Sequence, residues 1–534
     1  MASSASLPPP SDAHSGPSTL GRLGAAAVLM TTAVFASRVI GYLREAYVAA
    51  RFGANELTDA FYAAFTIPDW LNYLVAGGTL SITFLPLYAR HLARGDEAEA
   101  NRLLSVVSTT MLAVVGLGVL VGELFAEPLV AAFFNLPPEA LAACVRMTRV
   151  LLPAQLFFFA GAIFSATLFA RGRFAAAALA PLLYNVGIIA GGLALGSWLG
   201  PEGLAWGALA GAAVGPFLVP AVAALRAGGR WRPLIAPRDP GFVEWVKLSL
   251  PLMIGVSVVT ADDWILRFFA SDETGAITRL TYAKRLVAVP IAVAGQAIGQ
   301  ASMPFFARLF AEGKRDELAD TIARTLRGAG VIATLVAGWM IALAVPIIEV
   351  LFRRGNFTIA DVYPTAAYTA IFAAAVPLWA MQGLAARAFY AAGNTLTPMI
   401  AGTAVTLLSL PVYALLHRAA GPTGLAVASG IAIFGHTATL LALAPRILPE
   451  LRATVPAALR GLAATVLLAA VAAVAAWLAA AATTAFIPLE GHPAALASGF
   501  TGTLAFAAVV ALGAGPLGVQ EPRQLLARIL RRRR

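Results

Sequence analysis

Long and nearly uninterrupted runs of apolar residues dominate the sequence, and short polar connections separate them. The runs approach the roughly 20 residues that cross a bilayer as a helix, and they far exceed the roughly 9–11 residues of a membrane β-strand. Since backbone polar groups in lipid must be paired within their own segment, we predict helices. The pattern predicts about fourteen spans. Their approximate centres are Val34, Phe65, Val114, Phe158, Gly187, Ala213, Ile254, Ala294, Leu335, Ala374, Leu407, Ile431, Val471 and Phe506.

Composition agrees with this pattern, because 59% of the 534 residues are hydrophobic and only 12% are charged. A soluble chain carries about 25% charged residues, so the composition excludes a soluble enzyme, a fibrous protein and a disordered chain. The net charge of +11 is one feature of nucleic-acid-binding proteins. Here the basic residues lie between apolar runs instead of on one soluble face. We therefore predict an all-α polytopic membrane protein with no nucleic-acid partner.

The residues that usually hold metals or act as nucleophiles are sparse and scattered. Cys144 is the only cysteine, and the five histidines have no ligand spacing. The pair Asp262-Asp263 lies within an apolar run, so it does not resemble the D-D-x-x-D motif that a membrane-embedded transferase would place on a cytoplasmic loop. We expect no catalytic residue, no metal and no cofactor, so the protein is not expected to be an enzyme.

Lysine and arginine gather in alternate connections and in both tails, which predicts that both termini are cytoplasmic. Residues 1–20 are rich in Ser, Pro, Ala and Gly, and we expect a disordered tail without signal-peptide features. The basic tail 519–534 is typical of a topology anchor that contacts anionic membrane lipids. The chain is expected to be monomeric.

An internal repeat relates two halves of the chain. The segment Gly200-Pro201-Glu202-Gly203-Leu204-Ala205 recurs as Gly421-Pro422-Thr423-Gly424-Leu425-Ala426, and the segment beginning at Pro86 recurs at Pro304. Pro153 also matches Pro377, and Gly172 matches Gly393. These offsets are all about 220 residues, and each copy would hold six spans. An even span number inserts both copies in the same orientation, so we predict two six-helix lobes, 21–235 and 236–450, related by a pseudo-twofold axis along the membrane normal. Residues 451–518 would form an additional helix pair.

Charged residues interrupt the first two spans of each copy, and such residues usually face a bundle interior or a wet cavity. In the first copy they are Arg38, Arg44, Glu45, Asp59 and Asp69, and in the second they are Asp262, Asp263, Arg267, Lys284 and Arg285, with Arg387 further along. The pseudo-symmetry would bring them together between the lobes. Cations exceed acids, and the arginine fork fits phosphate oxygens, so the cavity is expected to bind an anionic cargo.

Two local patterns have structural interpretations. Asp263 and Arg267 are four residues apart, which predicts an ion pair along one helix. Gly295 and Gly299 form a G-x-x-x-G pattern, which predicts close helix packing.

The charged segments resemble a known family. Residues Ser37 to Ala46, with the Arg38-x-x-Gly41 and Arg44-Glu45 elements, followed by Phe52-Gly53-Ala54 and Thr58-Asp59-Ala60-Phe61, resemble the opening of the MurJ/MviN family of lipid II flippases. Tyr282-Ala283-Lys284-Arg285-Leu286, followed by Pro290, and the segments Phe352 to Phe357 and Tyr390 to Pro398 are also similar.

The resemblance covers nearly the whole chain and implies fourteen spans and membership of the multidrug/oligosaccharidyl-lipid/polysaccharide exporter superfamily. It implies a flippase that moves lipid II, a peptidoglycan precursor, across the bacterial inner membrane by alternating access. It also implies a cavity whose arginines match Arg38, Arg44 and Arg285 and whose aspartate matches Asp59. Together with Lys284 and Arg267, these residues form the predicted substrate site. The last two spans would form a groove for the lipid tail.

The sequence departs from this family in its second span. An arginine of the family pattern is replaced by Asn72, and a glutamate is replaced by Gly77. Two alternatives therefore stay open, a flippase for another polyprenyl-pyrophosphate-linked glycan and a non-transporting membrane scaffold. An ion-coupled multidrug exporter would have twelve spans and an acidic cavity, and neither fits the pattern.

Overall fold

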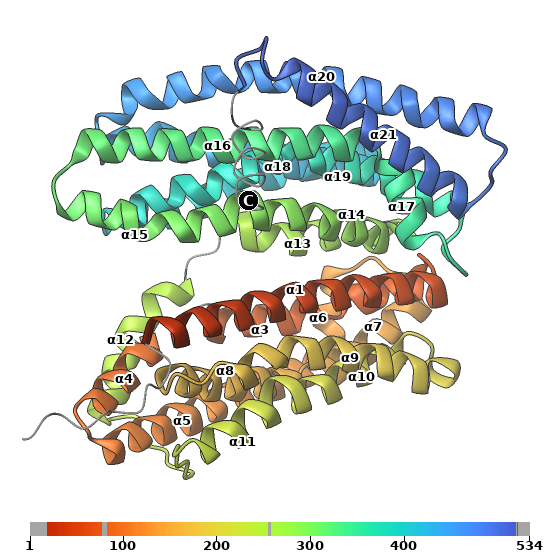
Figure 1. Cartoon of the computed structure of the whole chain (residues 1–534). Helices are drawn as coiled ribbons and strands as arrows, with labels where there is room; N and C mark the ends of the chain where they lie inside the picture. Colours follow the sequence, from red (N-terminus) through yellow and green to blue (C-terminus); the bar gives the residue numbers. More distant parts are fainter. Residues whose placement is uncertain (1–18, 77–82, 255–257, 520, 522–534) are drawn as a thin grey trace, which may run out of the picture.

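The computed structural model describes residues 19–76, 83–254, 258–519 and 521, and all regular elements within these ranges are helical (Figure 1). Gly77 and both tail segments, 1–18 and 522–534, lie outside the described residues. Ten helical segments of the described part are long and apolar enough to cross a membrane. One of them, 396–446, contains two helices joined at Gly421. The count of fourteen spans stays a prediction.

The helices form two bundles that lie one above the other in Figure 1. The first bundle comprises α1 to α12. Its helices are α1 (Thr19–Phe52), α2 (Glu56–Ala63), α3 (Thr66–Ala76), α4 (Leu85–Ala93), α5 (Glu97–Leu124), α6 (Ala126–Phe133), α7 (Pro138–Leu151), α8 (Ala154–Ala170), α9 (Ala175–Leu199), α10 (Glu202–Ala212), the π-helix η2 (Ala213–Leu218), α11 (Val219–Arg226) and α12 (Pro240–Ile254). Although α12 follows the predicted lobe boundary at residue 236, it packs on α3 and α5.

The second bundle comprises α13 to α21. Its elements are α13 (Val258–Phe269), the 3₁₀ turn η3 (Ala270–Asp272), α14 (Ala276–Ile291), the π-helix η4 (Ala292–Ala297), α15 (Ile298–Ala311), α16 (Arg315–Ala342), α17 (Ala344–Phe352), α18 (Ile359–Ala391), α19 (Leu396–Leu443), the 3₁₀ turn η5 (Ala444–Arg446), α20 (Leu451–Phe486) and α21 (His492–Gly513). The pair α20 and α21 packs on α16 and α17 at the outer side of this bundle (Figure 1).

Glycines at matching positions give the two halves the same turns. Gly200 ends α9 with φ 57° and ψ −140°, and Gly421 interrupts α19 with φ 55° and ψ −142°. Gly172 and Gly393, which the repeat also pairs, have φ values of 68° and 74°. A residue with a Cβ atom rarely adopts this region, so glycine is the residue that permits each turn. The shared conformations support the repeat that the sequence predicts.

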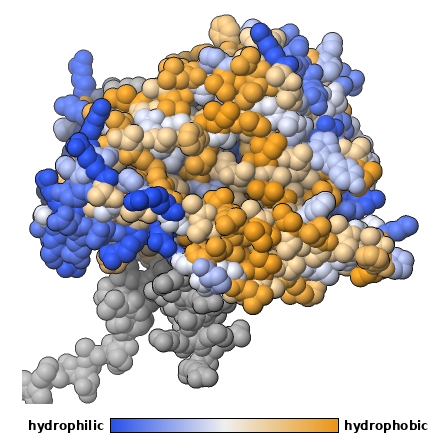
Figure 2. Space-filling model, turned by 90° about the horizontal axis from the view of Figure 1, so that it is seen from above, coloured by the Kyte–Doolittle hydropathy of each residue, from blue (hydrophilic) through white to orange (hydrophobic). Residues whose placement is uncertain are grey.

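Apolar side chains cover the outer surface of the second bundle. Figure 2 shows a broad hydrophobic area over the middle of this face, with hydrophilic residues toward its ends. Val466, Val471, Val474 and Trp477 of α20 are all more than half exposed. A soluble protein rarely exposes an apolar area of this extent, so the surface is suited to a bilayer.

The two bundles are joined where α1 ends. The backbone N–H of Asn356 donates to the carbonyl of Ala50 at 2.9 Å, and its side-chain amide donates to the carbonyl of Arg51 at 2.7 Å. The hydroxyl of Thr274 donates to a carboxylate oxygen of Glu56 at 3.2 Å. We call these contacts, with those of Asp59 described below, the interbundle seal.

Candidate functional site

The site begins at Glu45, a carboxylate on α1 that is 1% exposed and has partners from both bundles. Arg44 donates from Nε to Glu45 Oε1 at 2.8 Å, and the hydroxyl of Tyr62 donates to Oε2 at 2.5 Å. Arg285 of α14, in the second bundle, forms an ion pair with the same Oε1. Two of the predicted substrate-binding arginines therefore share one buried counter-charge.

Further contacts hold each of these arginines in place. Arg44 donates from Nη1 to the side-chain oxygen of Asn185 at 2.7 Å. The guanidinium of Arg285 lies 5.3 Å from the centre of the Tyr62 ring, and Tyr42 donates its hydroxyl to the backbone carbonyl of Arg285 at 2.8 Å. A cation over an aromatic face is stabilised electrostatically. The pair of arginines thus lies at the junction of α1, α2, α9 and α14.

Arg267 on α13 also contacts the opposite bundle. Its Nη1 lies 3.2 Å from Asp69 Oδ2 and 3.3 Å from the hydroxyl of Thr66, both on α3. The predicted pair between Asp263 and Arg267 is wrong, because Asp263 pairs with Lys284 instead. The four-residue spacing along α13 predicts that pair. In the structure the carboxylate near Arg267 is instead that of Asp69, on α3.

Lys284 bridges two carboxylates within the second bundle. Its ammonium group forms ion pairs with Asp262 and Asp263, and it lies 5.9 Å from the centre of the Trp379 ring. Asp262 is fully buried and also accepts hydrogen bonds from the hydroxyls of Tyr413 and, at 2.9 Å, Ser429. A buried carboxylate is stable only when it is paired and hydrogen-bonded, and Asp262 meets both conditions.

Asp59 lies in the interbundle seal and is 1% exposed. Its carboxylate accepts hydrogen bonds from the backbone N–H of Gly275 at 2.5 Å and of Thr278 at 2.7 Å, and from the Thr278 hydroxyl at 2.6 Å. These donors belong to the first turn of α14, where unpaired N–H groups favour a negative charge. The geometry gives Asp59 a positioning role, and contact with substrate stays a prediction.

Arg38 and Arg387 differ from the other cations, because no carboxylate pairs with either of them among the described residues. Arg38 is exposed on α1. Arg387 on α18 donates only to backbone carbonyls, those of Gly383 at 3.1 Å and Gln296 at 3.5 Å. These two guanidinium groups therefore contribute uncompensated positive charge to the region.

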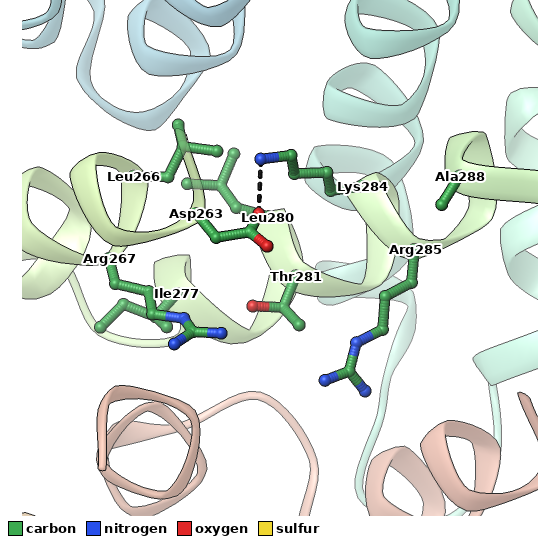
Figure 3. A pocket seen from close by; sticks show the side chains of 9 residues that line it. All are labelled: Asp263, Leu266, Arg267, Ile277, Leu280, Thr281, Lys284, Arg285 and Ala288. Carbon is green, nitrogen blue, oxygen red and sulfur yellow. Dashed lines mark ion pairs between the residues drawn. The ribbon is translucent and has the colours of Figure 1, made fainter. Parts of the chain in front are cut away.

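The paired cations Arg267, Lys284 and Arg285 line a cavity of about 180 Å³ that is formed by α13 and α14 of the second bundle. Its lining residues are Asp263, Leu266, Arg267, Ile277, Leu280, Thr281, Lys284, Arg285 and Ala288 (Figure 3). In Figure 3 the ends of Arg267 and Arg285 point toward the first bundle, and Lys284 points away from them toward Asp263. The six cations of the region exceed its five carboxylates by one. The arrangement suits an anion that replaces the carboxylates now held by these arginines.

Sequence reasoning placed the cations in the correct helices but missed how they are paired. The sharing of Glu45 depends on α14 lying beside α1, and no local pattern encodes that contact. Asn72 occupies the position at which the family pattern predicts an arginine. Its side-chain amide donates a hydrogen bond to the side-chain oxygen of Gln155 at 2.9 Å. A polar pair thus occupies the place of the expected charge.

Comparisons with known proteins give consistent results. The family model described as lipid II flippase MurJ matches residues 48–493. A probable lipid II flippase from Bdellovibrio bacteriovorus is 28% identical over 437 residues, which cover 80% of this chain and 83% of that protein. One from Vibrio cholerae is 29% identical over 437 residues, covering 78% of this chain and 82% of that protein.

Two solved structures establish the fold. Lipid II flippase MurJ in an inward closed conformation matches with a TM-score of 0.74 at 21% identity, over 92% of this chain and 99% of that one. An inward-facing multidrug resistance transporter of the MATE family matches with a TM-score of 0.63 at 17% identity, over 79% of this chain and 96% of that one. The predicted class, an all-α polytopic membrane protein, is confirmed.

Proposed function

Because this chain belongs to the lipid II flippase MurJ family, we propose that it moves lipid II, the polyprenyl-linked peptidoglycan precursor, across the bacterial inner membrane for cell wall synthesis. The observation that carries the proposal is the cavity formed by α13 and α14, where Arg267, Lys284 and Arg285 gather, and the helical segment that holds Lys284 and Arg285 is long and apolar enough to cross a membrane. An ion in the hydrocarbon core is costly, so a protein keeps such a cluster where it has a polar ligand to bind.

The arginines would hold the pyrophosphate of the cargo. A guanidinium presents a planar fork of donors that matches phosphate oxygens, and it keeps its charge at any physiological pH. Arg285 and Arg267 would exchange the carboxylates of Glu45 and Asp69 for phosphate oxygens, and Arg38 would approach from α1. Binding and release need no covalent step, so no nucleophile or cofactor takes part.

Movement of the cargo would follow from rocking of the two bundles. The Lys/Arg distribution supports an orientation in which the interbundle seal would lie on the outer side of the membrane and both termini in the cytoplasm. Closure at the seal would leave the cavity accessible from the cytoplasmic side. The headgroup would bind to the cavity from the cytoplasmic side. The bundles would then close at their cytoplasmic end and open at the interbundle seal, and this change would carry the headgroup across the membrane. The matching turns at Gly200 and Gly421 support two repeated lobes, 21–235 and 236–450, and α12, which packs on α3 and α5, would move with the first bundle.

The lipid tail would stay in an apolar groove on the second bundle. This groove has a volume of about 870 Å³ and lies between α16, α18, α19 and α20, with Ile341, Phe434, Val466 and Ala470 among its lining residues. Burial of apolar carbon atoms is favourable by about 0.8 kcal/mol per methylene group relative to water. The groove would therefore guide the tail while the polar head uses the cavity.

Complementation tests the proposal. Cells depleted of their own lipid II flippase should grow when this full-length chain is produced. Failure at normal membrane levels would overturn lipid II as the cargo. Asn72, hydrogen-bonded to Gln155, favours one alternative, a related polyprenyl-pyrophosphate-linked glycan. Transport assays in vesicles with lipids that differ only in the sugar would distinguish the two cargos, and activity with neither would favour a scaffold.

A further inference from the structure

A second cavity of about 440 Å³ lies within the second bundle, between α14, η4 and α18. It shares the lining residues Asp263, Lys284 and Ala288 with the cavity of Figure 3, so the two cavities lie next to each other. Its other polar lining comes from the amides of Gln296 and Gln382, the hydroxyl of Tyr390 and the guanidinium of Arg387. The lining thus combines neutral hydrogen-bonding groups with the guanidinium of Arg387, which has no carboxylate partner among the described residues.

Arg387 is the charged side chain of this second cavity that has no carboxylate partner among the described residues, although the charges of Lys284, Arg387, Asp262 and Asp263 sum to zero. Lys284 is neutralised there by Asp262 and Asp263, whereas Arg387 donates only to the neutral carbonyls of Gly383 and Gln296. A guanidinium has five N–H donors in a fixed fork, and two carbonyl contacts leave several of them available. An oxyanion in the cavity would satisfy both the charge and the free donors.

A glycine keeps room for this guanidinium. A Cβ atom at position 299 would lie 1.9 Å from Nη1 and 2.4 Å from Cζ of Arg387. At position 295 it would lie 2.9 Å from Cα of Ala380. The G-x-x-x-G pattern was interpreted as helix packing, and this holds for Gly295. Gly299 instead leaves space for the side chain of Arg387. A larger residue at position 299 would displace the guanidinium from its present position.

We propose that this second cavity is a subsite in which Arg387, assisted by the amides of Gln296 and Gln382, binds a carboxylate of the transported headgroup. The inference rests on the proposed function, and it adds a contact distinct from the pyrophosphate contact of Arg267 and Arg285. A carboxylate matches the arginine fork in a bidentate geometry. Since the two cavities adjoin at Asp263, Lys284 and Ala288, one headgroup can place its pyrophosphate in the first and its peptide carboxylate in the second.

Binding measurements on the full-length protein in phosphatidylcholine nanodiscs test this subsite. The probes are undecaprenyl pyrophosphate alone, the same lipid with its disaccharide and peptide, and that lipid with the peptide carboxylates amidated. We expect Arg387→Gln to weaken binding of the acidic lipid by about ten- to a hundredfold, the range for loss of a charge-assisted hydrogen bond. Binding of undecaprenyl pyrophosphate and of the amidated lipid should not change.

A second variant tests the same subsite in case Arg387→Gln does not fold. Gly299→Ala keeps the charge of Arg387 but displaces its guanidinium, so it should show the same selectivity with a smaller loss. Arg446→Gln, at an exposed position in η5, is the matched control and should bind all three lipids as the unchanged protein does. If Arg387→Gln weakens the binding of all three lipids equally, Arg387 contacts the pyrophosphate or a bilayer phosphate. That result would overturn the proposed carboxylate subsite. No change with any lipid would also overturn it, whereas failure of the unchanged protein to bind undecaprenyl pyrophosphate would overturn the proposed function itself.

Discussion

Glu45 of α1 and Arg285 of α14 form an ion pair across the two bundles, and Glu45 also holds Arg44. One carboxylate is therefore shared by two guanidinium groups, which leaves one positive charge in excess, and separation of the bundles on this face would leave Arg285 without its counter-charge. An anion bound between the bundles can supply the missing charge. The pair thus links occupancy of the cavity to the relative position of the bundles.

Glu45→Gln should destabilise the protein, because a neutral amide removes the buried counter-charge of Arg44 and of the partly exposed Arg285. Loss of one partner from a buried ion pair costs about 3–5 kcal/mol. Thermal unfolding of the purified protein in detergent is the measurement. A transition temperature equal to that of the unchanged protein would show that Glu45 does not balance these arginines.

Glu312→Gln is the control for that substitution. Glu312 lies in the exposed connection between α15 and α16, where hydrogen bonds from Arg308 and Lys314 lower its pKa to about 2. Surface ion pairs of this kind contribute little to stability. The control should therefore unfold at nearly the temperature of the unchanged protein.

Arg38→Ala and Arg285→Ala should each abolish transport while the protein still inserts. Each removes a guanidinium that can bind phosphate, and loss of a charge-assisted hydrogen bond weakens binding by about ten- to a hundredfold. Lysine at either position should restore transport only in part, because an ammonium group lacks the bidentate fork. Growth of flippase-depleted cells, with membrane levels of each variant, is the measurement.

The two arginines should differ in their effect on stability. Arg285 pairs with Glu45 across the bundles, whereas Arg38 is exposed and has no carboxylate partner in the described part of the chain. Arg285→Ala should therefore also lower the unfolding temperature, and Arg38→Ala should not. If both alanine variants support growth at normal levels, the headgroup binds elsewhere and a scaffold role gains support.

The sequence predicted the helical membrane fold because long apolar runs and the 220-residue repeat are periodic features that one chain displays by itself. It also identified Arg44, Lys284 and Arg285 as charges within apolar runs, and their role in binding substrate stays a prediction. It did not predict that Glu45 forms ion pairs with two arginines, or that Asp263 forms an ion pair with Lys284 instead of Arg267. These partners come from different helices, so they depend on packing that spacing along one helix does not encode.

Ala470→Trp should impair transport by filling the apolar groove. Ala470 lines the groove on α20, and an indole there would occupy space proposed for the lipid tail. The control is Val474→Trp on the same helix, because Val474 is 57% exposed and does not line the groove. Vesicle transport with a long and a short prenyl chain is the measurement. An equal effect of Ala470→Trp on both chain lengths would contradict a role for the groove in holding the tail.

Reporter fusions should place the two membrane faces as the Lys/Arg distribution predicts. A reporter after Arg94 or after Arg232 should lie in the cytoplasm, and one at His492, the first residue of α21, should lie outside. The measurement is the activity of paired reporters that work on opposite sides of the membrane. A cytoplasmic result at His492 would reverse the orientation and place the interbundle seal on the inner face.

A cross-link across the interbundle seal should stop transport reversibly. Glu56 and Thr274 come from opposite bundles, and their side chains are joined by a 3.2 Å hydrogen bond. In the variant Glu56→Cys with Thr274→Cys, a short reducible thiol cross-linker should hold the bundles together at this end. The native Cys144 is buried and should not compete. Vesicle transport should fall after cross-linking and return after reduction, because alternating access requires the seal to open. Either cysteine alone, treated in the same way, is the control and should stay active. Continued transport by the cross-linked protein would show that the cargo crosses without separation of the bundles at this end.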